Sequence, residues 1–253
     1  MDRLSRLTAE PVTTASYTDT SAGLANGTAA LYAVAPLFRG TDGNLTEGAA
    51  TALLATPVAA PAGFAGTSLI EGTTNSGSVA FDAATGEITI RASGGDIWDA
   101  GDQGYFLNQA IEGDFQITAR LLSGPTNTSA WSKAGPMIRE SLEPGARSAM
   151  LYATAGNGVA FQWREITNEH TALAQVVDAA SLTVPIVLRL TRKGNVITSE
   201  FSTDDGKTFN LAADPFTYEA GLPARLYAGL AATAHNSRQV TQARFNGLEV
   251  KKL

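Results

Sequence analysis

The sequence predicts an all-β protein whose main body is a two-sheet antiparallel jelly-roll sandwich. Clusters of Gly, Thr, Ser and Asn recur about every ten residues, and short runs of alternating apolar and polar residues lie between them, which is typical of sandwiches and barrels. Residues 115–121 are one such run, with Phe115, Ile117 and Leu121 on one face and polar side chains on the other. Helical periodicity is confined to residues 174–180, so we expect no helix longer than about two turns.

The remaining strands follow from the same alternation. Residues 184–191 and 196–202 are predicted to form a hairpin that turns at Gly194. Further strands are expected at residues 87–91, 159–164, 227–233 and 243–250. The large apolar members of these runs form the predicted core, namely Phe115, Ile117, Leu121, Ile138, Phe161, Trp163, Leu188 and Leu190.

Composition excludes several classes of function. The chain has 253 residues and no cysteine, which removes disulfides and thiolate metal sites. Its formal net charge is −6 and no basic run is longer than the terminal Lys251-Lys252, which argues against a nucleic acid as partner. No run of 18 apolar residues is present, so we expect no membrane insertion. Residues 1–6 lack an apolar region, and we therefore expect no signal peptide in this chain.

A change in composition divides the chain into three parts. Residues 1–56 are rich in Ala and Thr and hold few large apolar groups. Alanines with Pro57 and Pro61 give residues 57–65 the character of a linker, which begins to show at Thr51. Residues 66–253 form the predicted sandwich.

The first part resembles the second half of a fibronectin type III domain. The resemblance lies in residues 15–20, 24–28, 32–34 and 43–48, which include an Asn-Gly-Thr turn and a Gly-Asn-Leu-Thr-Glu-Gly run. It implies a partial β segment at residues 1–56 whose open edges favour pairing with a second copy or with a larger parent chain. Ala29 and Ala30 stand where that family usually has the tyrosine of its tyrosine corner.

The main body carries a second and more extensive resemblance. Its motifs are Gly94-Gly95-Asp96-Ile97-Trp98, the segment 131–142 with Lys-Ala-Gly-Pro-Met-Ile-Arg-Glu-Ser, the run 159–164 and Ala234-His235-Asn236. In this order they resemble the concanavalin A-like domains, of the DUF1349-type group, that are found on secreted bacterial glycoside hydrolases and cell-surface proteins. The resemblance implies a jelly roll with one concave face and an extracellular or cell-surface location. It does not fix one activity.

Alternation gives the side chains expected on that concave face. In residues 133–140, Lys133 and Arg139 fall on one face of the strand and the apolar set that ends at Glu140 falls on the other. Gln162 and Arg164 likewise lie opposite the apolar side chains of their strand. Such donors suit sugar hydroxyls, and aromatic rings suit the C–H faces of sugars. The predicted ligand-binding set is Trp98, Gln103, Trp131, Lys133, Arg139, Glu140, Gln162, Arg164, His235 and Asn236.

The alternative to a ligand site is a structural ion-pair network. Buried cations need partners, so Glu140 or a loop aspartate is expected to approach Arg139 or Arg164. A calcium site at Asp96, Asp99 and Asp102 is a further hypothesis, since hard oxygen ligands at loop spacing suit Ca²⁺. Ordinary turn chemistry explains the same aspartates.

The favoured function is a non-catalytic module that binds a polysaccharide or oligosaccharide. A glycoside hydrolase, with Glu140 as the candidate carboxylate, is the first alternative, although no Glu-x-Asp-x-Glu motif is present. A structural or adhesion spacer is the second. Two carboxylates facing each other in the concave face would favour the enzyme, an aromatic platform would favour the binding module, and a face filled by its own side chains would favour the spacer.

Overall fold

A computed structural model describes residues 30–55, 60–70, 76–126, 128–177 and 184–253. All regular structure in these residues is β-strand, as predicted. Among them we find no helix long and apolar enough to cross a membrane. The chain divides into two compact units between Ala59 and Ala60, which lies inside the stretch expected to be a linker.

The described part of the first unit contains two pairs of antiparallel strands. Strand β1 (Ala30–Val34) pairs with β4 (Thr51–Ala55), and β2 (Leu37–Arg39) pairs with β3 (Leu45–Glu47). The prediction that linker-like structure begins at Thr51 is therefore wrong for residues 51–55. These residues form a strand despite their alanine-rich composition, because their backbone pairs with β1. Most of the fibronectin-like residues, 15–20 and 24–28, lie outside the described residues, so that resemblance stays a prediction.

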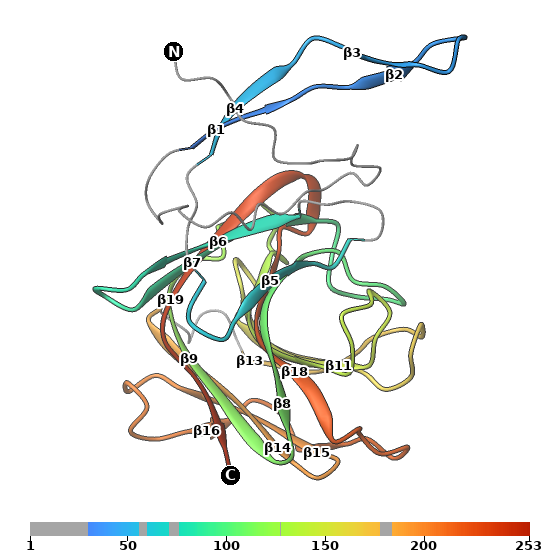
Figure 1. Ribbon diagram of the computed structural model, residues 1–253. Coiled ribbons are helices and arrows are strands. Elements are labelled where there is room, and N and C mark those ends of the chain that lie inside the picture. The colour runs from blue at the N-terminus through green and yellow to red at the C-terminus, as the bar shows by residue number, and fades with distance from the viewer. Residues whose placement is uncertain (1–29, 56–59, 71–75, 127, 178–183) are drawn as a thin grey trace. The chain divides into compact units, whose positions relative to one another are not determined.

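The second unit contains a seven-stranded antiparallel sheet, here called the front sheet. Its order is β13-β12-β11-β10-β18-β8-β5, and Figure 1 shows β8, β18 and β11 curving together. Its strands in chain order are β5 (Ala65–Ser68), β8 (Tyr105–Glu112), β10 (Lys133–Arg139), β11 (Ser148–Thr154), β12 (Val159–Arg164), β13 (Ala172–Val177) and β18 (Arg225–Thr233).

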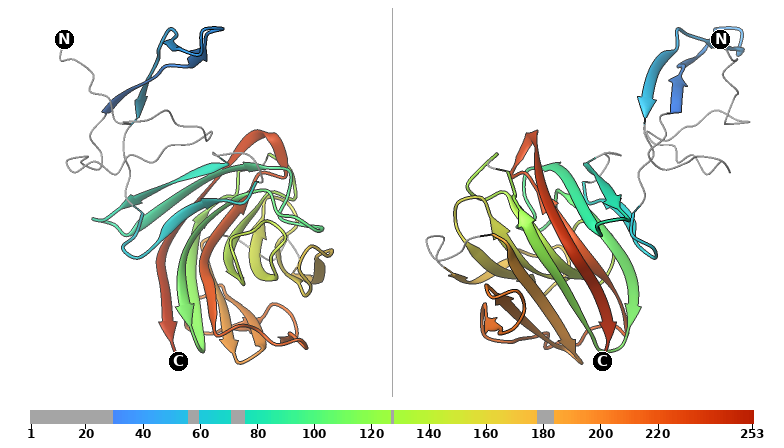
Figure 2. Two further views of the ribbon diagram at one scale, coloured as in Figure 1. Left: turned by 45° about the vertical axis from the view of Figure 1, so that its right-hand side comes forward. Right: turned by 90° about the vertical axis from the view of Figure 1, so that its left-hand side faces the viewer.

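An eight-stranded antiparallel sheet, the back sheet, packs behind it. Its main order is β16-β15-β14-β9-β19-β7-β6, with β17 also paired to β15, and Figure 2 shows β9 and β19 running side by side. Its strands in chain order are β6 (Gly77–Asp82), β7 (Glu87–Gly94), β9 (Phe115–Ser123), β14 (Ile186–Lys193), β15 (Val196–Ser202), β16 (Asn210–Leu211), β17 (Phe216–Thr217) and β19 (Asn236–Lys252).

The main hydrophobic core lies between the two sheets. Seven of the eight predicted core residues belong to it and are at most 3% exposed. The eighth, Trp163, is half-buried against the same core and stacks on Phe161 with ring centroids 5.7 Å apart. The predicted hairpin is present as β14 and β15, which pair from Val187 with Ser202 to Lys193 with Val196. The helix-like stretch 174–180 is strand β13 as far as Val177, where pairing with β12 outweighs its helical periodicity.

Tight strand packing in the front sheet gives a test of this fold. A Cβ added at Gly229 in β18 would overlap the carbonyl oxygen of Leu107 in β8. Overpacking of this kind typically costs about 1–3 kcal/mol, so we expect Gly229→Ala to lower the free energy of unfolding by about that amount in urea titrations. Gly101→Ala is the matched control, because its Cβ would meet no described atom within 4 Å. Equal stability of the two variants would contradict the strand register.

Candidate functional site

The outer face of the front sheet, which was expected to be concave and open, is covered by the loop between β7 and β8. A second apolar cluster forms there from the sheet residues Phe106, Met137, Met150, Tyr152, Ala160 and Ala231 together with Leu69 and Ile97. Ile97 lies in the loop and is 1% exposed. The loop, residues 95–104, therefore acts as a plug for this face. Strand β10 is consequently buried on both sides.

Two arginines and one aspartate lie at the centre of the plugged face. Arg139 in β10 and Arg164 in β12 each pair with Ser148 of β11, so they share one row across three strands. Asp102, from the plug loop, accepts from Arg139 through Oδ2 and from Arg164 through Oδ1, the latter at 2.6 Å. All three residues are at most 2% exposed. One carboxylate thus neutralises part of the charge of two neighbouring guanidinium groups.

Backbone carbonyls from three loops take the remaining arginine donors. Arg164 donates to the carbonyl oxygens of Asp99 at 2.9 Å, Ala146 at 3.0 Å and Glu169 at 3.1 Å. Arg139 donates to the carbonyl oxygen of Ser141 at 3.2 Å. The arginines therefore fasten the β7–β8, β10–β11 and β12–β13 loops to the sheet, and their buried charge is compensated as buried cations require.

Lys133 is the third buried cation of this face. Its Nζ donates to Asp96 Oδ1 at 2.9 Å, to the carbonyl oxygen of Ile97 at 3.0 Å and to Gln162 Oε1 at 3.1 Å. It also lies 5.0 Å and 5.1 Å from the ring centroids of Trp98 and Tyr152, a favourable cation–π arrangement. Burial lowers the pKa of Lys133 from its usual value, and the charge of Asp96 opposes that shift.

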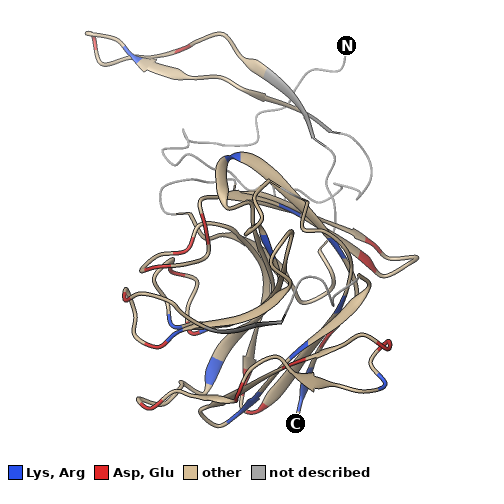
Figure 3. Ribbon diagram, turned by 180° about the vertical axis from the view of Figure 1, so that it is seen from behind, with Lys and Arg blue, Asp and Glu red and all other residues tan. Residues whose placement is uncertain are grey.

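The predicted concave-face donors are thus brought together but are not accessible. Lys133, Arg139, Gln162 and Arg164 lie on one face, and each is at most 2% exposed. Of the two partners expected for the arginines, Glu140 or a loop aspartate, the structure has the aspartate, Asp102. Figure 3 shows the acidic residues mostly in loops and at strand ends, while many cations lie on strands. This face is filled by its own side chains, and the four donors form hydrogen bonds within the protein.

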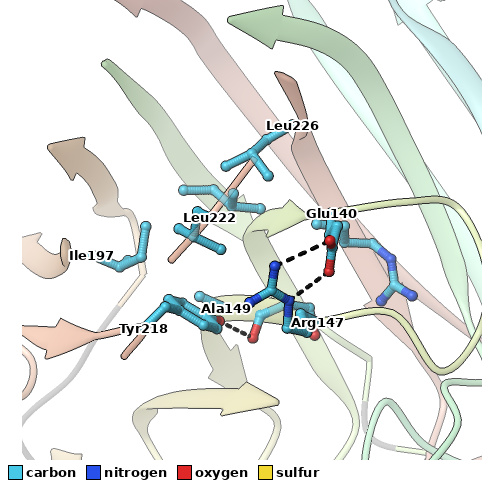
Figure 4. A pocket seen from close by; sticks show the side chains of 10 residues that line it. Glu140, Arg147, Ala149, Ile197, Tyr218, Leu222 and Leu226 are labelled. Atoms are coloured by element: carbon cyan, nitrogen blue, oxygen red, sulfur yellow. Dashed lines mark hydrogen bonds and ion pairs between the residues drawn. The ribbon is translucent and has the colours of Figure 1, made fainter. Parts of the chain in front are cut away.

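Glu140, a member of the predicted ligand-binding set, does not lie with this cluster. Alternation turns it to the opposite side of the sheet, where it lines a small cavity between the sheets with Ile138, Ala149 and Leu226 (Figure 4). Its carboxylate makes a two-pronged ion pair with Arg147, with oxygen–nitrogen distances of 2.6 Å and 3.1 Å.

The three aspartates considered for calcium have separate surroundings. Asp102 is occupied by two arginines and Asp96 by Lys133, whereas Asp99 is exposed and has a φ of 47°. Within the described residues, no group of three or more His, Asp or Glu side chains is arranged to hold a metal ion. The calcium hypothesis therefore gains no ligand set from this structure.

At the edge of the plugged face, polar and aromatic groups remain accessible. Asp96 Oδ2 lies 3.4 Å from His235 Nε2, and His235 Nδ1 lies 3.3 Å from Ser129 Oγ. The backbone N–H of Trp131 donates to Ser129 Oγ at 3.2 Å. His235 has a side chain that is 38% exposed, and Trp98 and Trp131 are half-buried. We call Asp96, Trp98, Ser129, Trp131 and His235 the rim.

The other two members of the predicted set have local structural roles. Gln103 is exposed, and its Oε1 accepts from the backbone N–H of Gly95 at 3.0 Å, which closes the base of the plug loop. Asn236 Oδ1 accepts from the backbone N–H of Arg238 at 3.0 Å at the beginning of β19. Sequence reasoning did not find Ser129, which lies in an irregular loop and carries no motif.

Comparison with known proteins identifies the fold but not a family. No protein-family model and no curated protein matches the chain. A functionally unknown protein from Saccharomyces cerevisiae superimposes with a TM-score of 0.57 and 18% identity, covering 76% of this chain and 97% of that one. Arcelin-5, a lectin-like defence protein from Phaseolus vulgaris, gives a TM-score of 0.50 and 8% identity over 76% of this chain and 93% of its own.

A longer protein shares the same fold over part of its length. A mutant of the GH43 protein BlXynB from Bacillus licheniformis gives a TM-score of 0.50 and 13% identity, covering 87% of this chain but 46% of that chain. The main body is therefore a jelly-roll sandwich of the concanavalin A-like lectin type, which confirms the predicted fold class. At these identities the likeness establishes the fold alone.

The plugged face generates a stability prediction. Removing Arg164 would leave Asp102 with half of its compensation and would release the carbonyls of three loops. Breaking a buried ion pair typically costs about 3–5 kcal/mol, and we expect Arg164→Ala to lower the free energy of unfolding by that amount. Arg244→Ala is the control, since Arg244 forms an ion pair with Glu87 on the surface and such pairs contribute little. Similar denaturation midpoints for the two variants would contradict the structural role of the cluster.

Burial of Tyr152 predicts an alkaline loss of stability. Burial, and secondarily Asp96, raises the pKa of Tyr152 above its ordinary value near 10. A raised folded-state pKa gives stability that is complete below pH 10 and is lost as pH rises through the folded-state pKa, at up to about 1.4 kcal/mol per pH unit. We expect Tyr152→Phe to reduce the slope of unfolding free energy against pH between pH 10 and 11, measured by urea titration. An unchanged slope would contradict this assignment.

Proposed function

We propose that this chain is a carbohydrate-binding module of a secreted or cell-surface protein, that it does not cleave glycosidic bonds, and that it binds its glycan at the rim. The observation that carries the proposal is that two half-buried tryptophans, Trp98 and Trp131, lie on the loops that also carry Asp96 and Ser129, both of which approach His235. Rings of this kind stack on the C–H faces of sugars, while Asp96 and His235 suit the hydroxyl groups. The fold shared with a lectin-like protein and a GH43 protein supports a sugar-related role.

The plugged face supports the rim by fixing its position. Lys133 holds Asp96 through its side chain, and Arg164 Nη2 donates to the carbonyl oxygen of Trp98 at 3.2 Å. Both cations are buried. A rim held in one geometry loses little conformational entropy when a ligand binds, which favours affinity.

Two other functions remain to be separated from this one. A structural or adhesion spacer is favoured by one observation, the filling of the outer face by the protein's own side chains. A glycoside hydrolase requires two carboxylates about 5–10 Å apart, one of them able to donate a proton. Asp96, Asp102 and Glu140 are each ion-paired with a cation of this chain, so none of these three carboxylates faces a second carboxylate as its only partner.

Binding at the rim predicts the effect of removing its aromatic rings. We expect Trp98→Ala and Trp131→Ala each to weaken glycan binding by about tenfold or more, as loss of a buried aromatic anchor typically does. The measurement is calorimetric titration with an oligosaccharide first identified on a glycan array, at a temperature where every variant is folded.

Trp163→Phe is the matched control, because Trp163 packs against the inter-sheet core and Phe216 instead of the rim. It should bind as the unaltered protein does. Failure to retain any glycan on the array would favour the spacer, and release of reducing sugar from a bound polysaccharide would favour the hydrolase.

A further inference from the structure

Three rim residues form a chain of hydrogen-bonding groups that the binding function does not require. Ser129 Oγ lies 3.3 Å from His235 Nδ1, and His235 Nε2 lies 3.4 Å from Asp96 Oδ2. The serine and histidine come from different loops, 106 residues apart in sequence. Both residues are partly exposed.

Neighbouring groups select the direction of these hydrogen bonds. Ser129 Oγ accepts from the backbone N–H of Trp131 at 3.2 Å, which leaves its own proton free to point toward His235 Nδ1. Asp96 accepts at Oδ1 from Lys133 Nζ and from the backbone N–H of Ile97 at 2.7 Å, so this oxygen is occupied and Oδ2 is the one that faces His235. Its Oδ2 then favours the tautomer of His235 that carries hydrogen on Nε2.

The two loops are also fastened to each other. Thr128 Oγ1 donates to the carbonyl oxygen of Ala234 at 2.6 Å, immediately before His235. Ser132 Oγ donates to the carbonyl oxygen of Ser129 at 2.8 Å. His235 itself has a φ of 50°, a left-handed conformation that is uncommon for a residue other than glycine. A strained residue held between fastened loops is a feature often found at functional sites.

We propose that Ser129 is an acyl-accepting nucleophile, with His235 as its general base and Asp96 as the residue that positions His235. The substrate class is an ester of a small carboxylic acid, such as an acetyl ester. Its alcohol part is a saccharide if the proposed glycan-binding function holds. The arrangement follows the logic of a nucleophile, a base and an orienting carboxylate, with the roles of the two imidazole nitrogens exchanged relative to the serine protease triad.

The reaction proceeds in two balanced steps. Ser129 Oγ gives its proton to His235 Nδ1 and attacks the ester carbonyl carbon; the bond from that carbon to the alcohol oxygen breaks, and the alcohol leaves with the proton from Nδ1. Water then gives a proton to Nδ1 and attacks the acyl carbon. The bond to Ser129 Oγ breaks, the proton returns to Oγ, and the carboxylic acid leaves.

The first experiment labels the unaltered full chain with a fluorophosphonate, which phosphonylates nucleophilic serines, and locates the label by peptide mass spectrometry. We expect the label at Ser129. Because this measurement needs no variant, it stands even if a substitution disturbs folding. Labelling of another serine, or of none, overturns the proposal.

The second experiment measures hydrolysis of p-nitrophenyl acetate. We expect Ser129→Ala and His235→Ala each to lower kcat/KM by about 100-fold or more. Asp96→Asn should lower kcat while leaving KM nearly unchanged, because Asp96 acts through His235. His170→Ala and Ser78→Ala are the controls, since both residues are exposed and outside the rim. An unchanged rate for folded Ser129→Ala overturns the proposal.

The two proposals fail in different ways. Ser129→Ala should still bind the glycan identified for the unaltered protein, since both tryptophans remain. Label at Ser129 with no glycan retained overturns the binding function and leaves the acyl transfer standing. Glycan binding with no label at Ser129 does the reverse.

Discussion

The structure of the front sheet depends on the carboxylate of Asp102. Two guanidinium groups on neighbouring strands, both buried, would repel each other without an anion between them. Asp102 lies on the plug loop, so it can neutralise them only when the loop covers the sheet. Charge compensation and loop closure are therefore one event. Removing water from this face is tolerable because the carbonyls of the same loops take the remaining arginine donors.

Much of the fold could be predicted from the sequence because alternation with a period of two determines which side chains share a face. The faces of β10 and β12 were predicted in this way, and Ala134, Ile138 and Phe161 do lie in the inter-sheet core. Exposure could not be predicted by the same reasoning. Whether the second face of a strand meets solvent depends on a loop elsewhere in the chain, here residues 95–104, and alternation contains no information about such a long-range contact.

For the candidate site, too, the face of a side chain could be predicted from the sequence but its exposure could not. Lys133 and Gln162 could be assigned to one face, but their burial depends on the plug loop. Glu140 was included in the predicted ligand-binding set, although alternation already placed it on the face opposite Arg139, and there it forms an ion pair with Arg147. Ser129 carries no sequence pattern, and only the folding of β10 next to β18 brings its loop to His235. Alternation along a strand determines which side chains share a face, whereas the loops determine whether that face is exposed to solvent.

Asp96 divides its two oxygens between the interior and the surface. Oδ1 faces the buried ammonium group of Lys133, and Oδ2 faces the partly exposed imidazole of His235. A change in the charge of Lys133 or of His235 therefore alters the electrostatic interaction of the other group with Asp96, because the two share this one carboxylate. The position of the partly exposed His235 therefore depends on the buried ion pair between Asp96 and Lys133. Substitutions in the rim would have to leave this one residue in place, even though most of the residues around it lie on loops that tolerate change.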